Sequence, residues 1–397
     1  MDRVWPLSEN PTFEKTVTFL DSYKKVSIAA VWEYTYTINA RMTAEVTSAS
    51  FIHRLFGGIP MGESMTRILV KTMVRKTIRD IKDSPERSIR NLVDMALNFS
   101  EGRFQQDFFR TAQRMLENEN SAYYALVSDT VAHVDEDRLL TFGMNLGYNS
   151  CTVGAKRIRE IEKESGYNIP WAVSLQLDSD GFSKNKDRYH SVIRQGQELG
   201  IFTWLLFAQG CVQEYLELAE ANPDSVFIQL CRSADITGAL IDCASDVNNL
   251  MRAVRYDEDA PLACSLLRDA ELLYSVYCPY TQEDLQRIQN GDLLCDMEQL
   301  HPVFSAFLPE EGCPDPVQEQ VYESVNAARM AQTYHTVAWE LHRDGMTVDK
   351  IISEDPCWVS FDRNGNMYQY GNSMPIQEAN LFQKDLPQIF QQVLSKA

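Results

Sequence analysis

The sequence lacks any run of 18 consecutive apolar residues, and its strongest short apolar run is only 202–208. A transmembrane helix needs about 20 predominantly apolar residues, so none is expected. The opening residues, Met-Asp-Arg-Val-Trp-Pro, lack the basic and apolar regions of a secretory leader. These absences predict a cytoplasmic protein with no membrane partner.

Basic residues are fewer than acidic ones. The 37 Lys and Arg face 56 Asp and Glu, which gives a net charge of -19 and a pI near 4.8. Such a charge repels nucleic-acid phosphates, so no nucleic-acid partner is expected. Residues 1–137 are nearly neutral, with 17 basic and 19 acidic side chains. The acidic excess therefore lies in residues 138–397.

Closely spaced metal-ligand motifs are also missing. There is no Cys-x-x-Cys, and the six histidines have no zinc-protease spacing. This pattern predicts reduced thiols and no metal site. The nine cysteines occur singly, at Cys151, Cys211, Cys231, Cys243, Cys264, Cys278, Cys295, Cys313 and Cys357.

Three partial motifs each fail on a required residue. Residues 57–64 nearly form a phosphate-binding loop, but Glu63 replaces its lysine, so we expect a loop with Ser64 as a helix N-cap. Residues 342–345, His-Arg-Asp-Gly, resemble a kinase tripeptide without its other motifs. Residues 362–373 resemble a calcium loop without its glycine and glutamate. None of these segments is assigned the corresponding site.

The front of the chain has helical periodicity. The pattern predicts helices at 10–41, 64–82, 84–102, 104–115 and 121–134. In the second of these a basic stripe recurs every three or four residues, formed by Arg67, Lys71, Arg75, Arg79 and Lys82. The stripe fits either a solvated helix face or a surface that docks on an acidic partner, including the acidic back half of this chain.

From Arg138 onward, short apolar runs alternate with helical patterns. Such alternation predicts an α/β fold, a parallel barrel or partial barrel preceded by an N-terminal helical region. We therefore expect three regions: helices at 1–137, a barrel at 138–357, and a hairpin and helix at 358–397. The expected strands are 139–146, 171–177, 201–208 and 225–230, then 261–267 and 302–308, followed by a helix at 315–345 and a hairpin around Asn364-Gly365.

Polar residues follow several of these expected strands. In a parallel barrel, ligands bind beyond the carboxyl ends of the strands, so these side chains should face one cavity that holds a small polar ligand. Each of them also suits a helix cap or a loop hydrogen bond. The candidates are Asn145, Tyr148, Asn149, Asp178, Asp180, Gln209, Gln229 and Arg232.

At these residues the chain resembles the radical S-adenosylmethionine (radical SAM) family. Residues 139–151, LLTFGMNLGYNSC, are similar to the family's first strand and the start of its cluster loop. Residues 193–210 resemble its helix, glycine and strand segment, and 359–368 resemble its C-terminal hairpin. The family's three-cysteine loop is degenerate here, because only Cys151 is present.

The resemblance implies a partial barrel and leaves two functions open. One is a barrel without the three-cysteine cluster motif that binds a small polar molecule or a protein partner, with no cofactor and no redox catalysis. The other is an enzyme. It is either a divergent radical SAM protein, whose [4Fe–4S] cluster and S-adenosylmethionine would need distant cysteines such as Cys231 and Cys264, or a lyase or isomerase. The latter would use Asp178 or Asp180 as general base and Arg232 for substrate anions.

Overall fold

The computed structural model describes residues 63–99, 110, 113–210, 212–353, 355–369 and 374–396. The helix expected at 10–41, the loop at 57–62 and most of the helix expected at 104–115 lie outside this part of the chain. Among the helices described, none combines the length and the apolar character that crossing a bilayer requires.

The central element is a curved sheet of nine strands in the order β7-β6-β5-β4-β3-β2-β1-β8-β9. All neighbouring pairs are parallel except the β8–β9 hairpin. The two edge strands do not pair with each other, so the chain forms an α/β partial barrel, and the predicted fold class is confirmed. The strands are β1 (Ala172–Asp178), β2 (Thr203–Gln209), β3 (Val226–Cys231), β4 (Leu250–Arg255), β5 (Tyr274–Tyr280), β6 (Phe304–Pro309), β7 (Val337–Glu340), β8 (Val359–Phe361) and β9 (Met367–Gln369).

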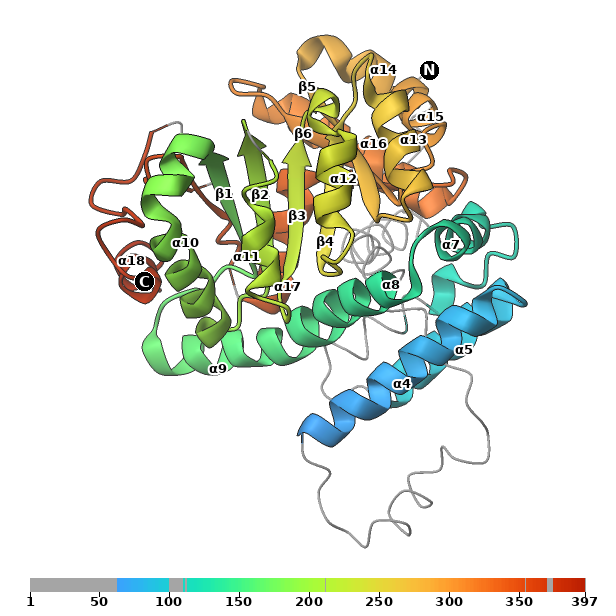
Figure 1. The fold of residues 1–397 in the computed structure, drawn as a ribbon, viewed down its shortest axis with the longest axis horizontal. Coiled ribbons are helices and arrows are strands. Elements are labelled where there is room, and N and C mark those ends of the chain that lie inside the picture. Colours follow the sequence, from blue (N-terminus) through green and yellow to red (C-terminus); the bar gives the residue numbers. More distant parts are fainter. Residues whose placement is uncertain are drawn as a thin grey trace, which may run out of the picture.

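Helices connect successive strands and lie along one face of the sheet (Figure 1). The connecting helices are α10 (Ser179–Leu199), α11 (Leu216–Glu220), α12 (Gly238–Ala244), α13 (Ala260–Asp269), α14 (Leu285–Gln289), α15 (Asp292–Glu298), α16 (Asp315–Ala331) and α17 (Leu341–Ile352), with short 3-10 turns at Ser233–Asp235 and Gln282–Asp284. Helix α18 (Leu386–Val393) follows the hairpin and contacts α10.

Alternation along the strands separates the two faces of the sheet. The register aligns Trp204 with Phe227, and both are fully buried on the face that α10 covers, where Gly196 lies against the Trp204 ring. The opposite face carries the exposed Gln176 next to the half-buried Phe207. Most residues of β1 and β2 are buried on both faces of these strands, which explains why the strands read as apolar runs.

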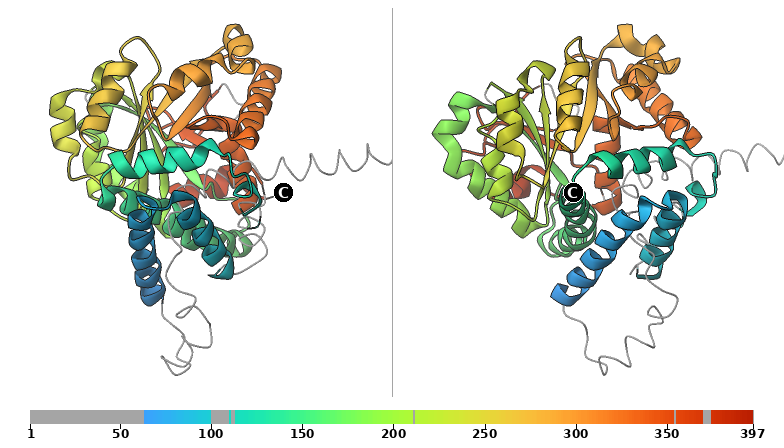
Figure 2. Two further views of the ribbon diagram at one scale, coloured as in Figure 1. Left: turned by 90° about the vertical axis from the view of Figure 1, so that its right-hand side faces the viewer. Right: turned by 45° about the vertical axis from the view of Figure 1, so that its right-hand side comes forward.

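A second group of helices lies at the amino-terminal edge of the sheet (Figures 1 and 2). Helix α8, the π-helix η1 and α9 follow one another without a break, next to the α4–α5 pair. The bounds of this group are α4 (Glu63–Ile81), α5 (Pro85–Phe99), α7 (Ala122–His133), α8 (Glu136–Gly143), η1 (Met144–Gly154) and α9 (Ala155–Ser165).

The strand predicted at 139–146 is wrong, because these residues form α8 and the start of η1. Leu140 and Phe142 are each 1% exposed, so the residues of this run are apolar because the helix is buried and not because they form a strand. A short, fully buried segment has a similar apolar composition whether it forms a helix or a strand. The first strand of the sheet is therefore β1, and the predicted cluster loop around Cys151 lies within a helix.

Two later predictions are also corrected. The segment 261–267 belongs to α13 rather than to a strand, and the long helix expected at 315–345 is interrupted by β7. Strands β4, β5 and β7 were missed. The hairpin is confirmed, and Gly365 takes the left-handed conformation (φ 80°) that its turn requires.

The basic stripe of α4 contacts acidic residues of this chain. Arg67 pairs with Asp224 at 2.5 Å, Arg75 with Asp137 at 2.7 Å, and Arg79 with Glu136 at 2.9 Å. All three arginines are partly exposed. Three residues of the stripe thus pair with acidic residues of α8 and of the loop before β3, and only one of these partners, Asp224, belongs to the acidic back half named in the sequence interpretation.

Candidate functional site

Strands β1 and β2 end side by side, with Asp178 opposite Gln209 in the register. Both residues line a groove with a volume of about 750 Å³ at the carboxyl-terminal edge of the sheet. Asp180, from the first turn of α10, lines it as well. Three of the eight sequence candidates therefore share one groove, at the edge where parallel sheets bind ligands.

Asp178 also has a structural task. Its Oδ1 accepts a hydrogen bond from the Gly181 backbone N–H at 2.7 Å, which caps the N-terminus of α10. Asn185 donates to the Gly181 carbonyl at 2.9 Å, at the point where α10 is kinked. Asp180 is exposed and is the freer carboxylate of the two.

The β8–β9 turn forms another wall of the groove, contributing Arg363 and Asn364. Asp362 fixes this turn, because its Oδ1 accepts from the backbone N–H groups of Asn364 at 2.9 Å and Asn366 at 2.8 Å. In the segment that resembles a calcium loop, the Asp362 carboxylate thus stabilises the turn through backbone hydrogen bonds. The aromatic ring of Phe382 completes this side of the groove.

The groove contains side chains of both charges. Asp178 and Asp180 are acidic, while Lys184 and Arg363 are basic. Within the described residues, neither Lys184 nor Arg363 forms an ion pair, so both cations are available to a ligand. Sequence reasoning missed Lys184, Arg363 and Phe382, although the Asn364-Gly365 turn signal marked the segment that carries Arg363.

Arg232 and Gln229 do not line this groove. Arg232 follows β3, but its side chain is 64% exposed and pairs with Asp235 at 2.6 Å. Gln229 is 1% exposed, donates to the Val212 carbonyl at 3.0 Å and accepts from Arg252. Arg232 and Gln229 therefore lie outside the groove that Asp178 and Gln209 share, and the guanidinium of Arg232 is paired with Asp235.

Asn145, Tyr148 and Asn149 lie at the opposite edge of the sheet, in η1. Asn145 donates to the carbonyls of Pro223 at 2.7 Å and Ser225 at 3.0 Å, which immediately precede β3. Asn149 donates to the Asp224 carbonyl at 2.9 Å, and Tyr148 is buried. The structure does not bring these residues to the groove, because the strand that would have carried them is a helix.

The described residues do not fit a three-thiolate cluster. Cys151 is half-buried in η1, where burial raises the pKa of its thiol well above the usual range. Burial also raises the pKa values of Cys231 and Cys264 to about 12, so both are neutral thiols in the metal-free protein. No three His, Cys, Asp or Glu side chains in this part of the chain could together hold a metal ion.

Comparisons with known proteins find solved structures of limited similarity. No family model and no curated protein matches the chain. Crystal structures of SuiB from Streptococcus suis are similar to it at 10% identity. The form bound to S-adenosylmethionine has a TM-score of 0.43, and the match covers 66% of this chain and 70% of the SuiB chain. The form bound to the precursor peptide SuiA has a TM-score of 0.44, and the match covers 66% of this chain and 71% of the SuiB chain. A third SuiB structure has a TM-score of 0.44, and the match covers 83% of this chain and 78% of the SuiB chain.

These similarities bear on two predictions. All three have 10% identity and TM-scores below 0.5, so they assign neither a family nor a chemistry to this chain. The expectation that no cofactor is bound is corrected and not retained, because one of the similar structures contains S-adenosylmethionine.

Proposed function

We propose that the chain binds a small zwitterionic molecule in the groove at the carboxyl-terminal edge of β1 and β2. The observation that carries the proposal is the set of polar groups of both charges, contributed by separate elements to one groove. Asp180 and Lys184 come from α10, Gln209 from β2, and Arg363 from the β8–β9 turn.

The arrangement suits a ligand with one cationic and one anionic group. A guanidinium pairs carboxylate oxygens bidentately, so Arg363, assisted by Lys184, is the contact for the anionic group. The carboxylate of Asp180 is the contact for the cationic group. The amide of Gln209 can both donate and accept, which suits the polar atoms between the two charged ends.

The groove is large enough for this class of ligand. Its volume of about 750 Å³ lies within the usual range for small-molecule sites, about 300–1,000 Å³. The Phe382 ring gives the ligand one apolar contact. A protein partner, the other kind predicted from the sequence, remains a prediction.

Titration calorimetry of the full chain tests the proposal. The probes are S-adenosylmethionine, the zwitterion present in a structure of similar fold, and the free amino acids methionine, arginine and glutamate. At least one probe should bind saturably, and Arg363→Gln and Asp180→Asn should each weaken binding at least tenfold.

The matched control is Arg232→Gln, which removes a charge from a neighbouring strand end outside the groove and should leave binding unchanged. Absence of saturable binding, or equal effects of Arg363→Gln and Arg232→Gln, would reject the proposal.

A further inference from the structure

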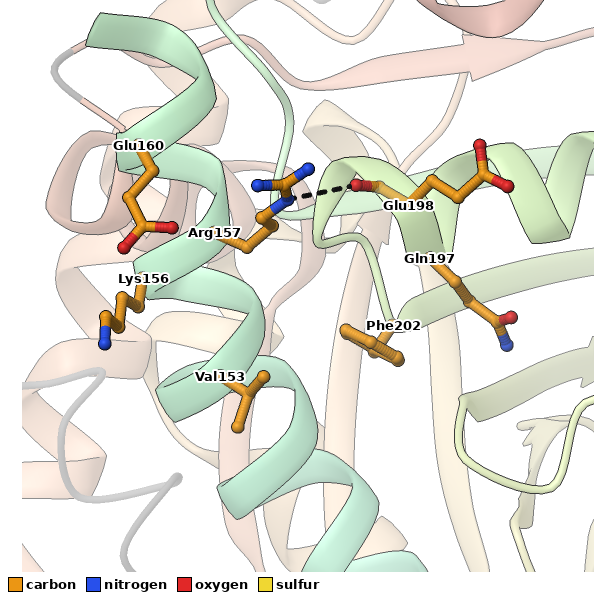
Figure 3. A pocket seen from close by; sticks show the side chains of 7 residues that line it. All are labelled: Val153, Lys156, Arg157, Glu160, Gln197, Glu198 and Phe202. Atoms are coloured by element: carbon orange, nitrogen blue, oxygen red, sulfur yellow. Dashed lines mark hydrogen bonds between the residues drawn. The ribbon is translucent and has the colours of Figure 1, made fainter. Parts of the chain in front are cut away.

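A second groove lies at the amino-terminal edge of the sheet, away from the proposed ligand groove. It has a volume of about 500 Å³ and runs between α9 and the turn that joins α10 to β2. Figure 3 shows Lys156, Arg157 and Glu160 projecting from α9, with Gln197 and Glu198 at the end of α10. The function proposed above does not use any of these residues.

The floor of the second groove is apolar. Val153, at the end of η1, and Phe202, just before β2, lie between the two walls (Figure 3). Both side chains are half-buried, so part of the Phe202 ring faces the groove rather than the core. An aromatic ring presented in this way favours a planar apolar ligand group, through offset or edge-to-face contact.

Arg157 projects from α9 toward the end of α10 (Figure 3). Its Nε donates to the backbone carbonyl of Glu198 at 3.3 Å, which links the two walls (Figure 3). Among the described residues, its two Nη groups have no hydrogen-bond partner. A guanidinium that donates through Nε leaves both Nη groups as a fork that matches a carboxylate.

Two glycines fix the distance between the walls. A Cβ at Gly154 would lie 2.3 Å from the Gly200 carbonyl oxygen, and a Cβ at Gly200 would lie 2.6 Å from the Gly154 carbonyl oxygen. The backbones of η1 and the α10–β2 turn therefore touch directly. The groove is preformed, which reduces the entropy that a ligand must lose on binding.

From these features we infer that the second groove binds a small aromatic monocarboxylate. The ring would lie on Phe202 and Val153, and the carboxylate would meet the Nη groups of Arg157. Glu160 and Glu198 on the rim disfavour ligands with further negative charges. This inference is independent of the function proposed for the carboxyl-edge groove.

Indole-3-acetate is the probe, with tryptamine and acetate as comparators. Titration calorimetry with the full chain should give saturable binding of indole-3-acetate. Tryptamine has the ring without the carboxylate and acetate has the carboxylate without the ring, so each should bind at least tenfold more weakly. Arg157→Gln and Phe202→Leu should each weaken indole-3-acetate binding at least fivefold, with unchanged circular dichroism.

Two further variants separate this groove from other sites. Lys163→Gln removes an exposed charge from the same helix outside the groove and should have no effect. Arg363→Gln removes a cation from the carboxyl-edge groove and should also have no effect. The inference is overturned by absence of saturable binding up to about 10 mM, by equal binding of tryptamine, or by loss of binding in Arg363→Gln but not in Arg157→Gln.

Discussion

Arg329 and Asp344 form a fully buried ion pair that joins α16 to α17. Arg329 Nη1 lies 2.5 Å from Asp344 Oδ2, Nη2 lies 2.8 Å from Oδ1, and both side chains are 0% exposed. Asp344 Oδ2 also accepts from the Glu340 backbone N–H at 2.8 Å, at the end of β7. The pair therefore ties the edge strand to the two helices that flank it.

Removing one partner of this pair should destabilise the fold strongly. Arg329→Met leaves the Asp344 carboxylate buried without its cation, which typically costs about 3–5 kcal/mol. Urea unfolding measures this loss. Arg287→Met breaks the exposed pair with Asp296 and is the matched control, with little expected change. Equal stability of the two variants would contradict the packing described for β7.

Gly345 provides the space that Trp358 occupies. A Cβ at Gly345 would lie 2.3 Å from the Trp358 ring, so Gly345→Ala should cost about 1–3 kcal/mol through overpacking. Gly238, at the start of α12, has no atom within 4 Å of an added Cβ. Gly238→Ala should therefore be neutral or stabilising, because alanine is the better helix former. Gly345→Ala should lower the thermal unfolding midpoint, whereas Gly238→Ala should leave it unchanged or raise it, and similar losses in the two variants would contradict this account.

Asp349 should make stability depend on pH. Burial raises its pKa to about 8, whereas an unfolded chain has an Asp pKa near 3.9. The folded form keeps a proton that the unfolded form releases, so the free energy of unfolding falls as pH rises from about 4 to about 8, by at most about 1.4 kcal/mol per pH unit.

Asp349→Asn removes the titrating proton and keeps a side-chain oxygen. That oxygen can still accept from the backbone N–H of Trp171, which donates to Asp349 Oδ1 at 2.7 Å. Urea unfolding at pH 5 and pH 7.5 should show a smaller loss of stability in the variant than in the parent. Asp242→Asn, on the exposed surface of α12, should keep the parent slope. An unchanged slope in Asp349→Asn would refute the role assigned to this carboxyl group.

The salt bridges of α4 should be weak singly and measurable together. Replacing Arg67, Arg75 and Arg79 by Gln removes three partly exposed pairs, each worth about 0.2–1 kcal/mol. Hydrogen exchange of the α4 amides should become about tenfold faster, and salt should have the same effect on the parent. Lys71→Gln with Lys82→Gln is the control, because within the described residues neither lysine forms an ion pair. Equal acceleration in the control would show that α4 is not held by these pairs.

The sequence predicted those elements whose local signals agree with their tertiary environment. β1, β2, β3 and β6 are apolar runs between helices, and the Asn364-Gly365 turn has the residues that its backbone requires. Residues 139–146 failed because a buried helix and a buried strand have similar apolar content. β4 was missed because Arg252 lies within it, buried against Gln229, so its run is not continuously apolar.

Correctly predicted strands were necessary for placing the candidate site but not sufficient, because Gln229 and Arg232 belong to or follow the correctly predicted β3 and lie outside the groove. Asp178, Asp180 and Gln209 follow correctly predicted strands, and they share the groove. Asn145 and Asn149 follow a strand that does not exist and lie at the other edge. Arg363 and Phe382 come from distant segments that only the tertiary fold brings to β1, so local patterns could not place them there.

The central claim is that the groove at the ends of β1 and β2 is a ligand site. A crystal structure of the full chain, soaked with the tightest-binding zwitterion of the calorimetric series, tests it most directly. The account predicts ligand density between Asp180, Gln209 and Arg363, with the anionic group on Arg363. Ligand density at any other place in a fully occupied complex, with an empty groove between these three residues, would contradict it.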